Sequence, residues 1–233
     1  MSEAGSESTP LAIDEDIAKV THHIEEMGRW ALDTARQALH AMESADPEAA
    51  RRVLERDDKL DTFDVEIEQE AIRILARRQP AAHDVRLLGA SIKLITYLDR
   101  IGRLGRDIAV YVIDAPSVPL VPPWPLLKSM GEHAFSMVEL ALEAYVQRDL
   151  SKASRVFDSD DAVDELNRQV LQECVRVLDG SPPEPRELLT YVLVSRHLER
   201  VADNACKVAE KTIYMETGKR RREFLTADKK VVL

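Results

Sequence analysis

The chain has 233 residues, of which 45% are hydrophobic but only 5% aromatic, and its formal net charge is −10 at pH 7. This negative net charge argues against a protein that wraps nucleic acid or lies on anionic lipid, because both functions need clustered lysine and arginine. There are two cysteines without a Cys-x-x-Cys pattern, no charged-then-apolar leader at residues 1–10 and no apolar stretch of about 20 residues. We therefore expect a cytoplasmic protein without a disulfide framework or a membrane span.

The sequence is duplicated within itself. Residues 27–61 align with residues 130–164 without a gap, and 13 of the 35 pairs are identical. Residues 98–109 and 198–209 continue the repeat after three residues of slippage. Internal repeats rebuild one supersecondary unit, and a composition rich in Ala, Leu, Arg and Glu but poor in Gly favours helices. The sequence therefore predicts an all-α fold of two tandem three-helix bundles related by internal duplication.

The first repeat is expected over residues 13–113, after a disordered tail at residues 1–12. Apolar residues spaced three and four apart predict a first helix over 13–42. The pair Asp46-Pro47 supplies a cap followed by proline at the first helical position, so a second helix should begin there and run to residue 78. Pro80 ends that helix and opens a third one, which extends to residue 113.

Residues 114–125 hold five of the eleven prolines and are predicted to link the repeats. The second repeat, over 126–218, follows the same plan, with Asp149 as a cap where the first repeat has Asp46. Its helices are expected over 126–147, 149–178 and 184–217. Residues 219–233 are expected to form a basic C-terminal tail, whose run from Lys219 to Arg222 is typical of a solvated helix end.

Acidic residues recur in both repeats where a helix would display them together. Residues four apart share one helix face. In the second repeat, antiparallel packing of two helices would bring together four carboxylates, those of Asp160, Asp164, Glu199 and Asp203. Such a group repels itself unless a cation lies among its oxygens, and Mg²⁺, Mn²⁺ and iron suit carboxylate and water ligands. We therefore predict a metal site in the second repeat.

The first repeat has the corresponding acids Asp57, Asp61 and Asp99, with Asp107 as a weaker candidate ligand. However, Arg103 stands where the second repeat has Asp203. A guanidinium there can neutralise Asp99 and Asp57 through forked hydrogen bonds, so metal binding is favoured in the second repeat. The alternative for both repeats is a solvated helix face on which the acids pair with arginines such as Arg100, Arg106 and Arg200.

Motifs for other chemistry are missing from the sequence. The six histidines form no Glu-x-x-His or His-x-x-x-His pair, which disfavours a di-iron centre of the ferritin type. There is no glycine-rich phosphate loop, no Ser-x-x-Lys and no Gly-x-Ser-x-Gly. Trp30, Met27 and Met130 lie at the spacing of packing residues. No catalytic nucleophile can be nominated, so we predict that the protein is not an enzyme.

Three segments resemble the PhoU family: residues 76–109, the paired acidic stretches 57–61 and 160–164, and residues 197–218. The resemblance spans residues 13–218 and includes the duplication. It implies two tandem three-helix bundles and an accessory role in phosphate uptake, with the ATPase of the phosphate ABC transporter and a sensor histidine kinase as partners. Some members bind multinuclear iron or zinc clusters at a Glu/Asp-x-x-x-Asp motif, which Glu199 and Asp203 match and which Asp99 and Arg103 do not.

The leading hypothesis is a cytoplasmic adaptor that negatively regulates phosphate uptake and phosphate-starvation signalling, and we expect a homodimer. One alternative is a related regulator of another ion transporter. Another is a metal-dependent enzyme or metal store that uses the carboxylate faces, with iron, zinc, manganese or magnesium as the ion. Phosphate-transporter genes beside this one would favour the first hypothesis.

Overall fold

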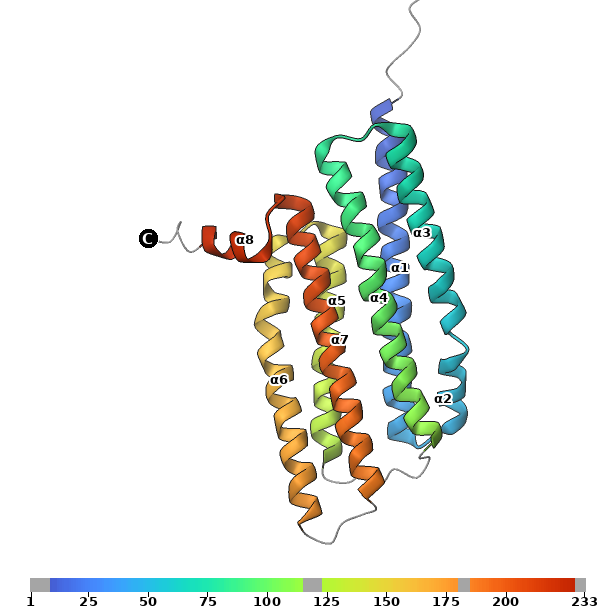
Figure 1. The fold of residues 1–233 in the computed structure, drawn as a ribbon, viewed down its shortest axis with the longest axis vertical. Coiled ribbons are helices and arrows are strands. Elements are labelled where there is room, and N and C mark those ends of the chain that lie inside the picture. The colour runs from blue at the N-terminus through green and yellow to red at the C-terminus, as the bar shows by residue number, and fades with distance from the viewer. Residues whose placement is uncertain (1–8, 115–122, 180–184, 229–233) are drawn as a thin grey trace, which may run out of the picture.

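A computed structural model describes residues 9–114, 123–179 and 185–228. This part of the chain contains eight α-helices and no strand, so the all-α prediction is confirmed (Figure 1). The helices are α1 (Thr9–Ser44), α2 (Pro47–Leu54), α3 (Asp57–Arg78), α4 (Ala82–Asp114), α5 (Pro123–Gln147), α6 (Leu150–Leu178), α7 (Pro185–Thr217) and α8 (Arg221–Asp228).

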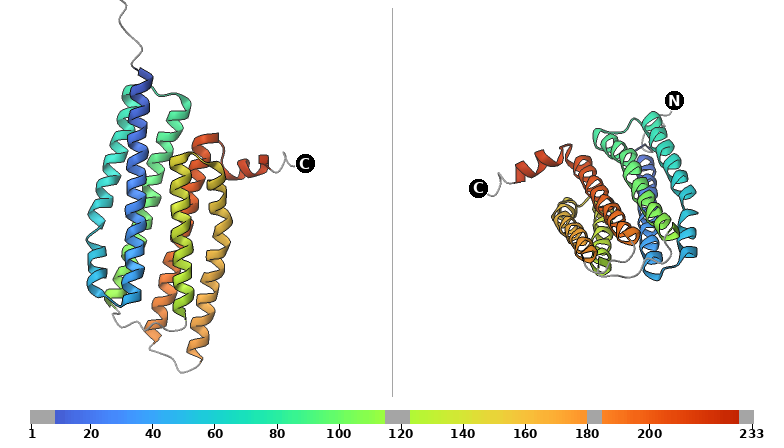
Figure 2. Two further views of the ribbon diagram at one scale, coloured as in Figure 1. Left: turned by 180° about the vertical axis from the view of Figure 1, so that it is seen from behind. Right: turned by 60° about the horizontal axis from the view of Figure 1, so that its bottom comes forward.

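The long helices form two bundles that lie side by side. Helices α1 to α4 make the first bundle and α5 to α7 the second, while α8 projects from the flank of the second (Figure 1). Helices α4 and α7 are neighbours on one side of the junction, and α1 and α5 are neighbours on the other (Figure 2). The prediction of two tandem bundles is therefore confirmed.

The two bundles meet through a contact that occurs twice. A Cβ atom added to Gly28 would lie 2.4 Å from a terminal methyl of Leu142, and one added to Gly131 would lie 2.4 Å from a terminal methyl of Leu39. The glycines are repeat partners of each other, and so are the leucines. Each leucine thus packs on the bare backbone of the opposite repeat, and the two bundles share one continuous hydrophobic core.

The turn between the first two helices of each repeat is built in the same way. Ala45 and Arg148, which are repeat partners, both adopt a left-handed backbone conformation, with φ of 48° and 55°. The next residue caps the following helix. Asp46 accepts hydrogen bonds from two backbone N–H groups at 2.9 and 3.0 Å, and Asp149 accepts two at 2.8 and 3.0 Å. Both predicted caps are confirmed.

The predicted second helix, over residues 47–78, is wrong as a single element, because the structure divides it into α2 and α3. The indole Nε1 of Trp30 donates to the carbonyl oxygen of Arg56 at 3.2 Å, and the same oxygen accepts the backbone N–H of Lys59, three residues on, at 3.3 Å. The turn between the two helices is thus tighter than a regular α-helical turn, and Trp30 anchors it. The second repeat has His133 at the position of Trp30, and its helix α6 is continuous.

Three other boundaries differ from the sequence-based expectation. Helix α1 begins at Thr9, inside the expected tail, and α5 begins at Pro123, inside the expected linker; each has a proline in its first turn, where no helical N–H is needed. Helix α8 lies inside the expected C-terminal tail, where the Glu223 carboxylate accepts the backbone N–H of Arg220 at 3.1 Å. Residues 1–8, 115–122, 180–184 and 229–233 lie outside the described parts of the chain.

The described helices were also compared with the length and hydropathy that a bilayer span needs. None of them is both long enough and apolar enough to cross a membrane.

Candidate functional site

Helices α6 and α7 bring the predicted acids of the second repeat within electrostatic range of one another. Burial raises the pKa of Asp160, and the neighbouring carboxylates of Asp164 and Asp203 raise it further. Burial likewise raises the pKa of Glu199, to which Asp164 and Asp203 again add, whereas Arg196 opposes the rise. The four residues proposed from the sequence therefore form one acidic cluster.

Positive charge is scarce around this cluster. Glu199 forms an ion pair with Arg196 one turn earlier on α7. Within the described residues, Asp160, Asp164 and Asp203 have no lysine or arginine within ion-pair distance, although the more distant Arg221 of α8 lowers the pKa of Asp160. The cluster thus carries excess negative charge that the described side chains do not balance.

A buried thiol completes this side of the cluster. Burial, with the adjacent Asp160 adding to it, raises the pKa of Cys206 to about 12. The thiol therefore stays protonated at neutral pH and donates a hydrogen bond to Asp160. Because the thiol is neutral, it leaves the negative charge of the cluster unchanged.

The corresponding cluster of the first repeat, between α3 and α4, is neutralised from within. The Arg103 guanidinium donates to both carboxylate oxygens of Asp99, at 2.9 and 3.0 Å, and to Asp61 at 2.9 Å. It also lies 3.7 Å from Asp57. The sequence-based expectation that Arg103 would pair with Asp99 and Asp57 is confirmed, and Asp61 is a third partner.

A second arginine strengthens this neutralisation. Arg106 donates to Asp57 at 2.7 Å, and it stands at the position that Cys206 occupies in the second repeat. The sequence had suggested Arg106 only as one of several surface partners. Asp107, the weaker ligand candidate, has a different neighbour: burial lowers the pKa of the His197 imidazole on α7, and the charge of Asp107 partly offsets that lowering.

Asp64 belongs to the first cluster and was missed from the sequence. Burial raises its pKa, and the carboxylates of Asp99 and Asp61 raise it further. Its repeat partner, Asn167, is 8% exposed, and its Oδ1 has no hydrogen-bond partner among the described residues. The signal was present in the spacing, since residues 57, 61 and 64 lie on one helix face.

The donor types of the two clusters differ in their suitability for a cation. The second cluster offers carboxylates, and Asn167, about one turn beyond Asp164 on α6, has an unpartnered amide oxygen; both are hard oxygen ligands. The first offers carboxylates already bound to guanidinium groups. Within the described residues, no three His, Cys, Asp or Glu side chains converge as closely as a bound metal requires. The metal site therefore stays a prediction.

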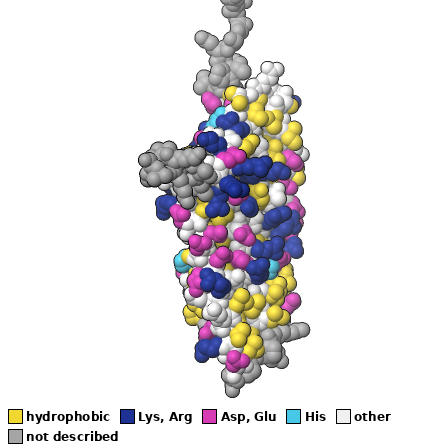
Figure 3. All heavy atoms as spheres, turned by 60° about the vertical axis from the view of Figure 1, so that its left-hand side comes forward, with side chains coloured by type: hydrophobic (Ala, Val, Ile, Leu, Met, Phe, Trp, Pro, Cys, Tyr) yellow, Lys and Arg dark blue, Asp and Glu magenta, His cyan; other side chains and the backbone are white. Residues whose placement is uncertain are grey.

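The surface reflects this separation of charge. On the face shown in Figure 3, Asp and Glu side chains gather across the middle, and Lys and Arg side chains gather above them. Asp164 and Asp203 are exposed, and Asp160 and Glu199 are half-buried, so the acids suit an ion or a protein surface better than a small organic substrate, which is usually enclosed.

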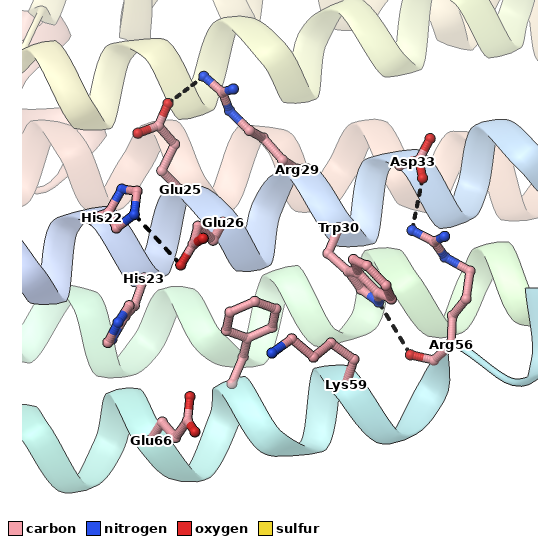
Figure 4. Close-up of a pocket in the computed structure, with 11 residues that line it drawn as sticks. His22, His23, Glu25, Glu26, Arg29, Trp30, Asp33, Arg56, Lys59 and Glu66 are labelled. Carbon is pink, nitrogen blue, oxygen red and sulfur yellow. Dashed lines mark hydrogen bonds and ion pairs between the residues drawn. The ribbon is translucent and has the colours of Figure 1, made fainter.

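A separate hollow of about 770 Å³ lies between α1 and α3 (Figure 4). Both of its arginines are paired with acids of the lining: Arg29 with Glu25 at 2.6 Å, and Arg56 with Asp33 at 2.8 Å. The Arg56 guanidinium also lies 3.9 Å from the ring centre of Trp30. These contacts hold the break between α2 and α3, so we assign the hollow a structural role.

Both repeats match a known domain. The family model described as the PhoU domain matches residues 24–112 and again residues 127–212. The chain belongs to the PhoU family. A phosphate-specific transport system accessory protein PhoU homolog from Clostridium acetobutylicum is 30% identical over 91% of this chain and 97% of its own length.

Solved structures agree with this assignment. The crystal structure of PhoU from Pseudomonas aeruginosa has a TM-score of 0.82 at 31% identity and covers 88% of this chain and 99% of its own. The phosphate transport system regulatory protein PhoU from Streptococcus pneumoniae also has a TM-score of 0.82, at 26% identity over 89% of this chain and 98% of its own. The PhoU fold therefore extends over the whole length of these relatives.

Proposed function

We propose that this PhoU-family protein is a cytoplasmic, non-catalytic regulator that restrains phosphate uptake and phosphate-starvation signalling. The proposal rests on the match of both repeats to the PhoU domain, over residues 24–112 and 127–212. It is supported by the names of the relatives, which are accessory or regulatory proteins of phosphate transport systems. The charged surface of the bundles is consistent with docking to a protein, and the sequence offers no motif for a catalytic nucleophile.

A deletion strain tests this function. In phosphate-rich medium, loss of the protein should leave phosphate uptake active and phosphate-starvation genes expressed, and a plasmid copy of the gene should restore repression. Uptake of labelled phosphate and transcript levels are the two measurements. Normal repression in the deletion strain would contradict the proposal and favour the alternative of a regulator for another ion transporter.

The partners expected for this role are the ATPase of the phosphate ABC transporter and a sensor histidine kinase. A pull-down with the tagged protein from phosphate-replete and phosphate-starved cells should recover both of them, with a difference between the two states. Tight and salt-insensitive binding to DNA would contradict a protein-docking role, since the net charge of −10 opposes phosphate-backbone contacts. The expected homodimer is tested by sedimentation velocity on the purified protein.

We further propose that the acidic cluster of the second repeat holds a divalent or trivalent cation. Asp160, Asp164, Glu199 and Asp203 would be its ligands, with the unpartnered Asn167 Oδ1 as an additional oxygen. Iron, zinc, manganese and magnesium are the candidate ions. A bound cation would neutralise the mutual repulsion of the carboxylates and connect α6 to α7. The proposal concerns the second repeat, because Arg103 and its neighbours already neutralise the first.

A further inference from the structure

A basic pocket of about 670 Å³ lies where the two repeats and α8 meet. Helix α4 of the first repeat, α7 of the second and the start of α8 each contribute to its lining. Six cationic side chains line it: Arg86, Lys93, Lys211, Arg220, Arg221 and Arg222. None of the carboxylates of either acidic cluster lines it.

Most of this positive charge is not balanced by the protein. Within the described residues, no carboxylate lies within ion-pair distance of four of the cations: Arg86, Lys93, Lys211 and Arg220. The one carboxylate in the lining, that of Glu210, forms its ion pair outside the pocket with Lys207, at 3.4 Å. By contrast, Asp16 elsewhere in the first repeat takes both Arg73 and Arg78 as ion-pair partners.

Local contacts hold several of these groups in place. Arg86 Nε donates to the Met215 carbonyl at 3.3 Å, which ties α4 to α7 across the repeat junction. The Lys211 ammonium lies 5.9 Å from the ring centre of Tyr214. Arg221 stacks at 3.8 Å over the ring of Phe157, and its buried Nε has no hydrogen-bond partner among the described residues. The pocket is therefore preorganised to receive hydrogen-bond acceptors.

We propose that this pocket binds a small anion that carries two or more phosphate groups. Four unbalanced cations match the charge of an oligophosphate, whereas a single orthophosphate dianion would leave about half of that charge uncompensated. Guanidinium groups match the geometry of phosphate oxygens, and the cations approach from three helices, as a concave small-ligand site requires. The volume also falls within the range of about 300–1,000 Å³ that is typical of such sites.

The pocket also has an uncharged part. Tyr214 is 38% exposed, and the Cα of Gly89 faces open space, since no other group lies within 4 Å of a Cβ placed there. An aromatic ring next to a phosphate-binding region can stack on a nucleobase. The oligophosphate can therefore come from a nucleotide or from an inorganic chain, and the experiment below separates these two sources.

Isothermal titration calorimetry of the full-length protein with orthophosphate, tripolyphosphate and ATP tests the proposal. EDTA is present throughout, so that a metal ion at the acidic cluster cannot bridge to the phosphates. We expect tripolyphosphate or ATP to bind with one site per chain, at least tenfold more tightly than orthophosphate. Equal affinity for tripolyphosphate and ATP indicates that the phosphate chain alone is recognised. If ATP binds more tightly than tripolyphosphate, and Tyr214→Ala lowers the affinity for ATP to that for tripolyphosphate, the ligand is a nucleotide.

Two double variants serve as the matched pair. Lys93→Ala/Lys211→Ala should weaken oligophosphate binding at least tenfold, whereas Lys19→Ala/Arg52→Ala removes the same charge from exposed positions outside the pocket and should change affinity less than twofold. Circular dichroism confirms folding, and Arg220→Ala, at the exposed residue before α8, replaces the first variant if that one does not fold. No binding, equal losses in both variants, or equally tight binding of a polyglutamate peptide would overturn the proposal. None of these results depends on the deletion phenotype.

Discussion

The two acidic clusters lie at the same place in the two repeats, yet they differ in their charge balance. The first repeat places Arg103 and Arg106 among its carboxylates, and the second repeat has Asp203 and Cys206 at those positions. At these positions two positive charges are replaced by one negative charge and a protonated thiol, a difference of three unit charges, which Asn167 in place of Asp64 reduces to two for the clusters as a whole. The duplicated scaffold tolerates this change because both clusters lie on partly exposed faces between two helices, where water limits the energetic cost.

The repeats also differ in how closely their helices pack. In the first repeat α4 approaches α1 so closely that a Cβ at Gly105 would lie 2.7 Å from the backbone of Ala35. The second repeat has Ala205 at the corresponding position of α7. The duplication therefore preserved the order and direction of the helices, while the distance between them and the side chains around the acids diverged.

The largest effect is expected at this close crossing. Gly105→Ala should destabilise the protein by about 2–3 kcal/mol, because the new methyl group would meet backbone atoms that cannot move aside without shifting a helix. Urea unfolding followed by circular dichroism measures it. Gly89→Ala on the same helix is the matched control and should stabilise by about 0.5–1 kcal/mol, since its Cβ would meet open space. Equal effects of the two substitutions would show that α1 and α4 do not pack as described.

The next effect concerns the break between α2 and α3. Trp30→Phe keeps an aromatic ring but removes the indole N–H that binds the Arg56 carbonyl, and should cost about 1 kcal/mol. The control is His133→Phe at the corresponding exposed position of the second repeat, which should change the free energy of unfolding by less than about 0.5 kcal/mol. If both variants unfold at the same urea concentration, the indole contact does not hold the break.

The smallest effects are expected from removing one charge in each acidic cluster, and they should have opposite signs. Asp57→Asn breaks the ion pair with Arg106 and should destabilise the metal-free protein by about 0.5–1 kcal/mol, less at high salt. Asp160→Asn should stabilise it at pH 7 by about 0.5 kcal/mol, because it removes a carboxylate that burial and like charges keep in an unfavourable ionised form.

The pH dependence of the second variant follows from the sign of the shift. The pKa of Asp160 is raised in the folded protein, so folding favours its protonated form. The cost of ionisation is absent below the ordinary carboxyl pKa of 3.8 and develops as the pH rises through the higher folded-state pKa. Urea midpoints of wild type and Asp160→Asn should therefore converge toward pH 4 and separate toward pH 7. A constant separation would contradict the repulsion described for this cluster.

Much of the fold was predictable because its signals are local. The caps at Asp46 and Asp149 and the spacing of the apolar residues define most of the helices, and the duplication defines their order in the two repeats. The break after α2 was not predictable, because it depends on Trp30, which lies 26 residues before Arg56. Helix α8 was missed because it has no counterpart in the repeat.

The candidate site was predictable to a similar extent. Spacing on helix faces brought Asp160 and Asp164 to the same cluster as Glu199, and repeat alignment identified Arg103 as the internal cation. The contributions of Arg106 and Asp64 depend on the rotation of α4 against α3, which periodicity alone does not specify. The basic pocket was missed for the same reason, since its cations on α4 are distant in sequence from those on α7 and at the start of α8.

The difference between the two clusters is tested most directly by the metal content of the protein. Wild type, Asp203→Ala and Arg103→Asp/Arg106→Cys are stripped with EDTA, soaked in iron, manganese or zinc, desalted and analysed for metal per chain. The double variant gives the first cluster the side chains of the second at these two positions. We predict that wild type retains metal, that Asp203→Ala loses most of it, and that the double variant retains more than wild type. Equal metal in all three proteins, or none in any of them, would contradict the account and leave both clusters as solvated helix faces.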